Sequence, residues 1–418
     1  MKAMHFNFKD LFRAPRLGFS LQRIWINGLG LLAGYIFYLV ITYISFFASG
    51  YSFLEVWYTF GLLPCAFAMP VPWYGTVIYI LGLAVFAAIL LLTNTAVARV
   101  VYMTLRDELF YTWTQAYKFA FKKWISSVGA MLTFLFIIAF FVIAALVMAF
   151  IGRIPYVGEL GTAILIIPYI FAALLLFFII LAFFVGTFFV PAILATSDED
   201  ALGGVFQSFS ITFNQPWRIV VYTSIIGILE FVGFFLFAAA IKISYNIFFW
   251  LFSVGMGDKM SHLSKYSLSL IDNAFPALYH WAHALPSNLG NWIYMIHQHP
   301  NLPEVSGTMA VAGYIVAVFL IIIGGSVLAY AEAIGNSGLT IIYVILYKLQ
   351  ENENLLERED EELKEEEEEE EEKTEEEKPV EAKVKETEKA KTTKPKRKTA
   401  KAPSKTAKKP APGKKTSK

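Results

Sequence analysis

Long runs of apolar, almost uncharged residues alternate with shorter mixed segments over the first 350 positions of the chain. A run of about 20 apolar residues is enough for a helix to cross a hydrocarbon core of about 30 Å. The pattern predicts an all-α membrane protein, a polytopic bundle of six transmembrane helices in three hairpins. The expected spans are about 24–47, 73–97, 125–151, 161–195, 219–240 and 308–330. The fourth run is too long for an upright helix, so we expect it to tilt or to protrude.

Amphipathic segments lead into the first, third and fifth runs. Each contains a pair with the spacing of a capping box, which is typical of a helix start: Asn7 with Asp10, Thr104 with Asp107, and Ser197 with Asp200. In the third segment, 197–219, five apolar residues share one helical face. They are Leu202, Val205, Phe206, Phe209 and Phe213. We therefore expect short helices that lie on the membrane surface.

These segments belong to an internal repeat. Aligning Trp124 with Trp217 also places Thr104 on Ser197, and the region around Trp25 gives a looser third copy. The repeated unit is an interfacial helix followed by a helical hairpin, used three times. Consecutive copies with the same orientation differ from the inverted halves of many carriers.

Three segments fall outside the six runs. Residues 241–307 are semi-polar and aromatic, and we expect an insertion outside the cytoplasm. The sequence GNSG at 335–338 predicts a helix break, after which 339–348 would form another interfacial helix. Residues 349–418 are expected to be a disordered tail, first acidic and then basic.

Composition agrees with a membrane protein, because the mean hydropathy is +0.54 and 56% of the residues are hydrophobic. The net charge of +1 hides a strong segregation. Residues 351–418 hold 21 of the 34 Asp and Glu and 19 of the 35 Lys and Arg. The glutamate part favours a helix or coiled coil. The basic block 394–415 is suited to anionic lipid or nucleic acid, but composition favours a solvated low-complexity tail.

Lysine and arginine also indicate the orientation. Lysines and arginines are concentrated before span 1, between spans 2 and 3, between spans 4 and 5, and after span 6. The exceptions are Arg153, between spans 3 and 4, and the lysines of the insertion. Cytoplasmic loops carry this excess. We therefore expect a multi-pass protein of the cell membrane with both termini in the cytoplasm. The single cysteine, Cys65, excludes a disulfide within the chain.

Two acids inside the apolar runs are the main candidates, each considered as a separate site. Glu230 lies near the middle of span 5, and Glu332 lies near the cytoplasmic end of span 6. An acid at this depth is costly and must face protein or water with a partner or a proton. One interpretation is an ion or proton relay or a contact to polar cargo. For Glu230 the other is a protonated carboxyl hydrogen-bonded to Ser, Thr or Tyr of a neighbouring span. For Glu332, which precedes GNSG, the alternatives are a site formed by unwound backbone and the simple end of a helix.

A second candidate is a group of histidines in the insertion. His280 and His283 have helical spacing, and His297 and His299 follow. Imidazoles can bind zinc or copper, but this spacing matches no standard metal motif. The alternative is an aromatic cap at the outer surface. We expect no cofactor, and no phosphate loop, nucleophile elbow or metalloprotease motif indicates an enzyme.

One sequence stretch resembles a known family. FQSFSITFNQPWRI (206–219), after a span that ends in VPAIL (190–194), is similar to a motif of bacterial six-span membrane proteins. These include the membrane domain attached to some glycerophosphodiester phosphodiesterases and its stand-alone relatives. The matching positions are Ser208, Phe209, Thr212, Trp217 and Arg218, and in TIIY near the C-terminus Thr340 and Tyr343. The resemblance implies six spans. The phosphodiesterase domain is not in the sequence, so that activity is not implied.

Two functions remain open on these observations. The first is a non-enzymatic membrane-organising or accessory protein with the tail as a charged tether, acting with the lipid bilayer and a membrane protein partner or further copies of itself. The second is a transporter or channel for a small solute or lipid that uses Glu230. The second function requires a polar cavity around Glu230.

Overall fold

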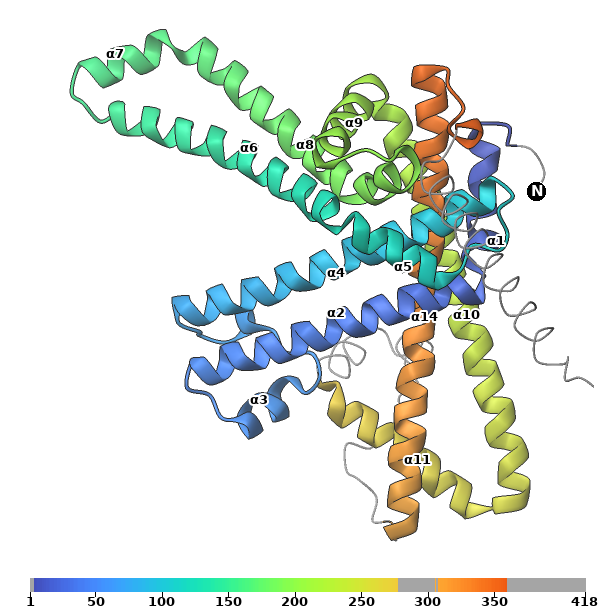
Figure 1. Cartoon of the computed structure of the whole chain (residues 1–418). Helices are drawn as coiled ribbons and strands as arrows, with labels where there is room; N and C mark the ends of the chain where they lie inside the picture. Colours follow the sequence, from blue (N-terminus) through green and yellow to red (C-terminus); the bar gives the residue numbers. More distant parts are fainter. Residues whose placement is uncertain (1–3, 277–304, 306, 359–418) are drawn as a thin grey trace, which may run out of the picture. The chain divides into compact units, whose positions relative to one another are not determined.

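The computed structural model describes residues 4–276, 305 and 307–358, and all regular elements in this part of the chain are helices (Figure 1). Six of them are long and apolar enough to cross a membrane. They are α2 (Leu21–Ala48), α4 (Trp73–Leu105), α6 (Trp124–Ile151), α8 (Ile166–Ser197), α10 (Pro216–Met256) and α14 (Gly307–Glu351). The predicted all-α fold with six spans is confirmed, and the chain is a multi-pass membrane protein.

The long helices pack as three consecutive pairs, α2 with α4, α6 with α8, and α10 with α14 (Figure 1). Shorter helices precede each pair: η1 (Phe8–Arg13) and α1 (Ala14–Gly18), α5 (Trp113–Lys122), and α9 (Ala201–Asn214). This order agrees with the threefold repeat expected from the sequence. The remaining elements are α3 (Phe53–Phe60), η2 (Ala66–Ala68), α7 (Val157–Ile164), α11 (Asp258–Ala274) and η3 (Leu355–Glu357).

The core lies where the second helix of each pair ends. Thr95–Met103 of α4 and Phe189–Ser197 of α8 are buried throughout. In α14, every residue from Ala329 to Leu346 is buried except Glu332 and Leu339. We call these three stretches the hub. Elsewhere the long helices expose many large apolar side chains, as expected for surfaces that face lipid.

Helix α14 runs without interruption through 335–338, so the predicted break at GNSG and the separate helix at 339–348 are wrong. The small residues there allow close helix contact instead. A Cβ atom on Gly338 would lie 2.5 Å from Cδ1 of Ile226 in α10, and one on Gly335 would lie 2.8 Å from a carboxylate oxygen of Glu230. The glycines therefore mark the place where α10 and α14 approach each other.

Three asparagines join α2, α4 and α14 at the same level. The Asn336 amide donates to the side-chain oxygen of Asn27 at 3.1 Å and to that of Asn94 at 2.9 Å. The Asn27 amide in turn donates to the Arg23 carbonyl at 3.1 Å. Polar side chains that hydrogen-bond across helices stabilise membrane bundles, because lipid offers them no alternative partner. The first helix pair is thereby fastened to the last long helix.

The capping box at Asn7 and Asp10 is confirmed, and the other two are wrong. Thr104 belongs to α4, which continues to Leu105, and the real box is formed by Thr112 and Gln115 at the start of α5. Sequence spacing alone did not distinguish this pair from the earlier one.

A similar shift occurs before α9. Ser197 is the last residue of α8 and donates to the Ile193 carbonyl, while Asp200 alone caps α9 by accepting from the Gly203 amide at 2.7 Å. The predicted apolar face of α9 is also divided. Val205 is buried against α6 and α8, whereas Phe206 is 69% exposed and therefore free to face lipid.

Other predicted boundaries also move. The fourth run is divided at Leu165 into α7 and α8, and α10 continues 16 residues past the expected end at 240, into the predicted insertion.

At the C-terminus the folded part extends beyond 348. Leu355 of η3 is fully buried, and its carbonyl accepts from the Tyr102 hydroxyl at 2.7 Å. Residues 349–357, which the sequence assigned to the tail, are therefore folded.

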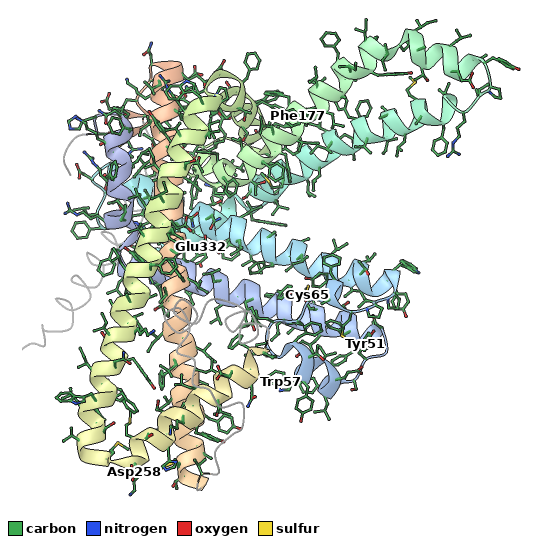
Figure 2. All side chains as sticks on the ribbon, turned by 180° about the vertical axis from the view of Figure 1, so that it is seen from behind. Tyr51, Trp57, Cys65, Phe177, Asp258 and Glu332 are labelled. Carbon is green, nitrogen blue, oxygen red and sulfur yellow. The ribbon has the colours of Figure 1, made fainter. Side chains whose placement is uncertain are left out.

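Tyrosines satisfy the irregular backbone at the far end of the first pair. The hydroxyls of Tyr35, Tyr38 and Tyr43 donate to the carbonyls of Leu62, Pro64 and Gly61. In Figure 2, Tyr51 and Cys65 are labelled in this region. Unpaired carbonyls are costly away from water, so these bonds let the chain turn back near the membrane.

The contact at Gly338 gives a first prediction. Gly338→Ala places a methyl group against three carbons of the Ile226 side chain, and we expect it to lower the free energy of unfolding by about 1–3 kcal/mol. The measurement is thermal unfolding of the purified protein in a neutral detergent. Gly325→Ala, on the same helix with no atom within 4 Å of the added carbon, is the control and should change little. Equal stability of both variants would show that the crossing is not tight.

Candidate functional site

Glu230 of α10 and Glu332 of α14 line one cavity of about 460 Å³. Figure 2 labels Glu332 part-way along α14, where α10 runs beside it. The two side chains are close enough for their charges to interact. The sequence presented them as two separate candidates, and the structure brings them together.

The carboxylates lie far from the ends of their helices. Glu230 is 14 residues from the start of α10, which is about 20 Å along the helix at about 1.5 Å per residue. A hydrocarbon core is about 30 Å thick, so this position is well inside a membrane that α10 crosses. Glu332 interrupts the buried stretch of α14 and is half-buried. Both acids therefore stand where a free charge is expensive.

The cavity offers these acids no polar partner. The cavity is less polar than the one expected for a transporter, because its other lining residues are all apolar: Leu31, Gly227, Phe231, Phe234, Leu328 and Ala331. Neither carboxylate forms a hydrogen bond or ion pair with a residue in the described part of the chain. The interpretation in which a protonated Glu230 hydrogen-bonds to Ser, Thr or Tyr of a neighbouring span has no such bond among the described residues and stays a prediction. The oxygens face a space that an exogenous cation or a proton can occupy.

Two buried arginines are functional candidates that sequence reasoning missed. Arg99 is fully buried, donates to the Ala195 carbonyl at 3.0 Å, and lies 4.3 Å from the centre of the Phe119 ring. Arg23 donates to the Leu17 carbonyl and, at 2.6 Å, to the Thr104 hydroxyl. From the sequence, both count only among the positive charges that indicate the orientation in the membrane. Their contacts to carbonyls and rings inside the hub indicate that they hold helix ends together.

The asparagines were also missed, although a signal existed. Asn27 and Asn94 stand within predicted spans, and Asn336 is one of two polar residues in GNSG. Polar side chains inside apolar runs are candidates for contacts between helices. Which ones meet depends on how the pairs pack, and a single sequence does not contain that information.

The residues of the family-like motif do not form one site. Ser208 and Thr212 are buried and donate back to carbonyls of α9, and Thr340 does the same in α14. Phe209 packs against Phe134 with ring centres 5.3 Å apart.

The other motif positions serve the surface and the hub. Trp217 is 61% exposed, with the Arg218 guanidinium 5.2 Å from its ring centre, as expected for interface anchors. Tyr343 is fully buried, and its ring centre lies 5.9 Å from that of Tyr347. These residues support packing and do not converge on a ligand.

No protein-family model, curated protein or solved structure matches this chain. The resemblance to six-span bacterial proteins therefore rests on the six helices and stays a prediction beyond them. His280, His283, His297 and His299 lie outside the described residues, as do 394–415. Within the described residues, no group of three or more His, Cys, Asp or Glu side chains could hold a metal ion.

The setting of Arg99 gives a second prediction. Arg99→Lys keeps the charge but removes the planar group that both stacks on Phe119 and reaches Ala195. We expect a loss of about 2 kcal/mol in the free energy of unfolding, because desolvated cation–π contacts are the strong ones. Thermal unfolding in detergent measures it. Arg153→Lys is the matched control, because Arg153 also stacks, 4.9 Å from the Phe150 ring centre, but on an exposed turn. An equal effect of both changes would contradict the assignment.

Proposed function

We propose that this membrane protein binds a cation at Glu230 and Glu332 and acts as a transporter or channel. One observation carries the proposal: two acids from neighbouring spans line one cavity and have no polar partner among the described residues. Ionisable groups inside membrane helices mark ion and proton pathways in many proteins. A proton or a cation between the carboxylates removes the repulsion between them and lowers the cost of burying them.

The charge distribution favours a cytoplasmic hub. Arg99 lies in the last turns of α4, and four further cations fall between α4 and α6: Arg106, Lys118, Lys122 and Lys123. The excess of Lys and Arg on this side supports the proposal that both termini are cytoplasmic. In that orientation the cavity opens within the membrane, at the outer edge of the hub, because Leu328, Ala331 and Glu332 lie at the start of the buried stretch of α14.

An organising role with the tail as a tether is the second function considered. It depends on residues 359–418, which lie outside the described part of the chain. No observation in the hub or along the long helices favours it over the cation site, so it stays a prediction from composition.

The third prediction tests the carboxylates. Dicyclohexylcarbodiimide is apolar and reacts with protonated carboxyl groups, so it reaches acids inside the membrane. With protein in lipid vesicles, we expect Glu230 and Glu332 to be modified much faster than two exposed acids, Glu108 between α4 and α5 and Glu159 in α7. Peptide mass spectrometry measures the labelling, which should decline as the pH is raised and the groups lose their protons.

Vesicle flux provides the functional readout for the same site. With an internal pH dye and an imposed membrane potential, we expect faster proton movement with the natural protein than with E230Q/E332Q. The control is E108Q/E159Q, which also removes two acids but leaves the cavity intact. Unmodified Glu230 and Glu332, together with equal flux in all three proteins, would contradict the proposal.

The orientation gives the fourth prediction. In a Cys65→Ser background, we expect a membrane-impermeant maleimide to label Glu159→Cys from outside intact cells. Glu108→Cys should react only after the membrane is opened, because it follows α4 at the hub side. Labelling of Glu108→Cys in intact cells would reverse the orientation.

A further inference from the structure

The cavity at Glu230 and Glu332 also indicates what kind of cation fits it. We infer that the ligand is an organic ammonium or similar hydrophobic cation, which enters from the bilayer between α10 and α14. This inference rests on the proposed function and specifies its substrate class. It is drawn from the walls and the mouth of the cavity.

The walls suit an apolar body. A volume of about 460 Å³ is within the range of sites that bind drug-sized molecules, which are mostly apolar with a few placed polar groups. Here the polar groups are two carboxylates, and Phe231 and Phe234 supply aromatic rings. Such rings attract alkylated ammonium groups through their faces, and a nearby acid adds the opposite charge. An apolar cation can use all of these contacts together.

The same cavity offers a metal cation too few oxygen ligands. Calcium takes about 6–8 oxygen ligands and magnesium about six. The cavity lining has only two side chains with oxygen atoms, and the backbone carbonyls of α10 and α14 at this level belong to continuous helices. A bare ion would keep most of its water, for which apolar walls offer no hydrogen bonds. The wall chemistry therefore selects a cation that carries its own hydrophobic surface.

Two residues that line the cavity are exposed on surfaces suited to face lipid. Phe231 is 63% exposed and Leu328 is 54% exposed, and both belong to helices that are apolar enough to span the membrane. A ligand that dissolves in the bilayer can reach the carboxylates by this lateral route. A hydrated ion would have to cross hydrocarbon to use it, which is costly.

Gly335 fixes the position of one carboxylate. A Cβ atom there would lie 2.8 Å from Oε2 of Glu230, which is the end of a flexible side chain. Gly335→Ala is therefore expected to push this oxygen aside while leaving both charges and the helix intact. Gly325→Ala is again the matched control on the same helix.

The test uses tetraphenylphosphonium, an apolar cation without hydrogen-bond donors, in equilibrium dialysis against protein in a neutral maltoside detergent. We expect saturable binding to the natural protein and no binding to E230Q/E332Q. The control E108Q/E159Q should bind as tightly as the natural protein. Phe231→Ala should weaken binding about tenfold, as expected for the loss of one desolvated cation–π contact. Gly335→Ala, which displaces an oxygen of Glu230, should weaken binding by a similar factor. Thermal unfolding confirms that each variant is folded.

Competition identifies the ligand chemistry and its source. Displacement by benzyltributylammonium supports a free organic cation, and displacement by lysophosphatidylcholine alone supports the same ammonium chemistry on a lipid headgroup. Displacement only by Na⁺ or Ca²⁺ would overturn the inference. Absent phosphonium binding with normal carbodiimide labelling would overturn it too, but would leave the proposed cation site standing. If the carbodiimide labelling also fails, the proposed function fails with it.

Discussion

The close crossing of α14 with α2, α4 and α10 is the contact on which the rest of the structure depends. Between helices in lipid there is little hydrophobic driving force, so association relies on close packing and on hydrogen bonds. Both occur over one turn of α14, where Gly335 and Gly338 remove side-chain bulk and Asn336 binds two other helices. Without this turn, the first and third pairs would share few specific contacts.

The same crossing produces the candidate site. Because Gly335 has no side chain, the carboxylate of Glu230 can lie against α14, on the helix that carries Glu332. A larger residue would fill the place that this oxygen occupies. The feature that packs the helices therefore also brings two acids together at a depth where neither would be stable as an isolated charge.

The sequence predicted those parts of the fold that depend on local pattern. Six apolar runs predicted six spans because length and hydropathy are nearly sufficient for a helix in lipid. The threefold order of short helix and helical pair followed from a repeat. GNSG was misread, because glycine and asparagine break helices in water but serve as contact residues between membrane helices. The pairing of Glu230 with Glu332 depends on the register of two helices about 100 residues apart, and one sequence does not encode that register in a readable form.

The end of the folded part has a mechanical consequence. The Tyr102 hydroxyl holds the Leu355 carbonyl, and Gln350 reaches Ser210 of α9 at 2.6 Å. The last folded residues are thus fastened to α4 and α9, beside the most buried ends of the long helices. A pulling force on the chain that follows Glu357 would therefore act first on these two hydrogen bonds. It would reach the lipid-exposed outer halves of the helices only after the bonds had broken.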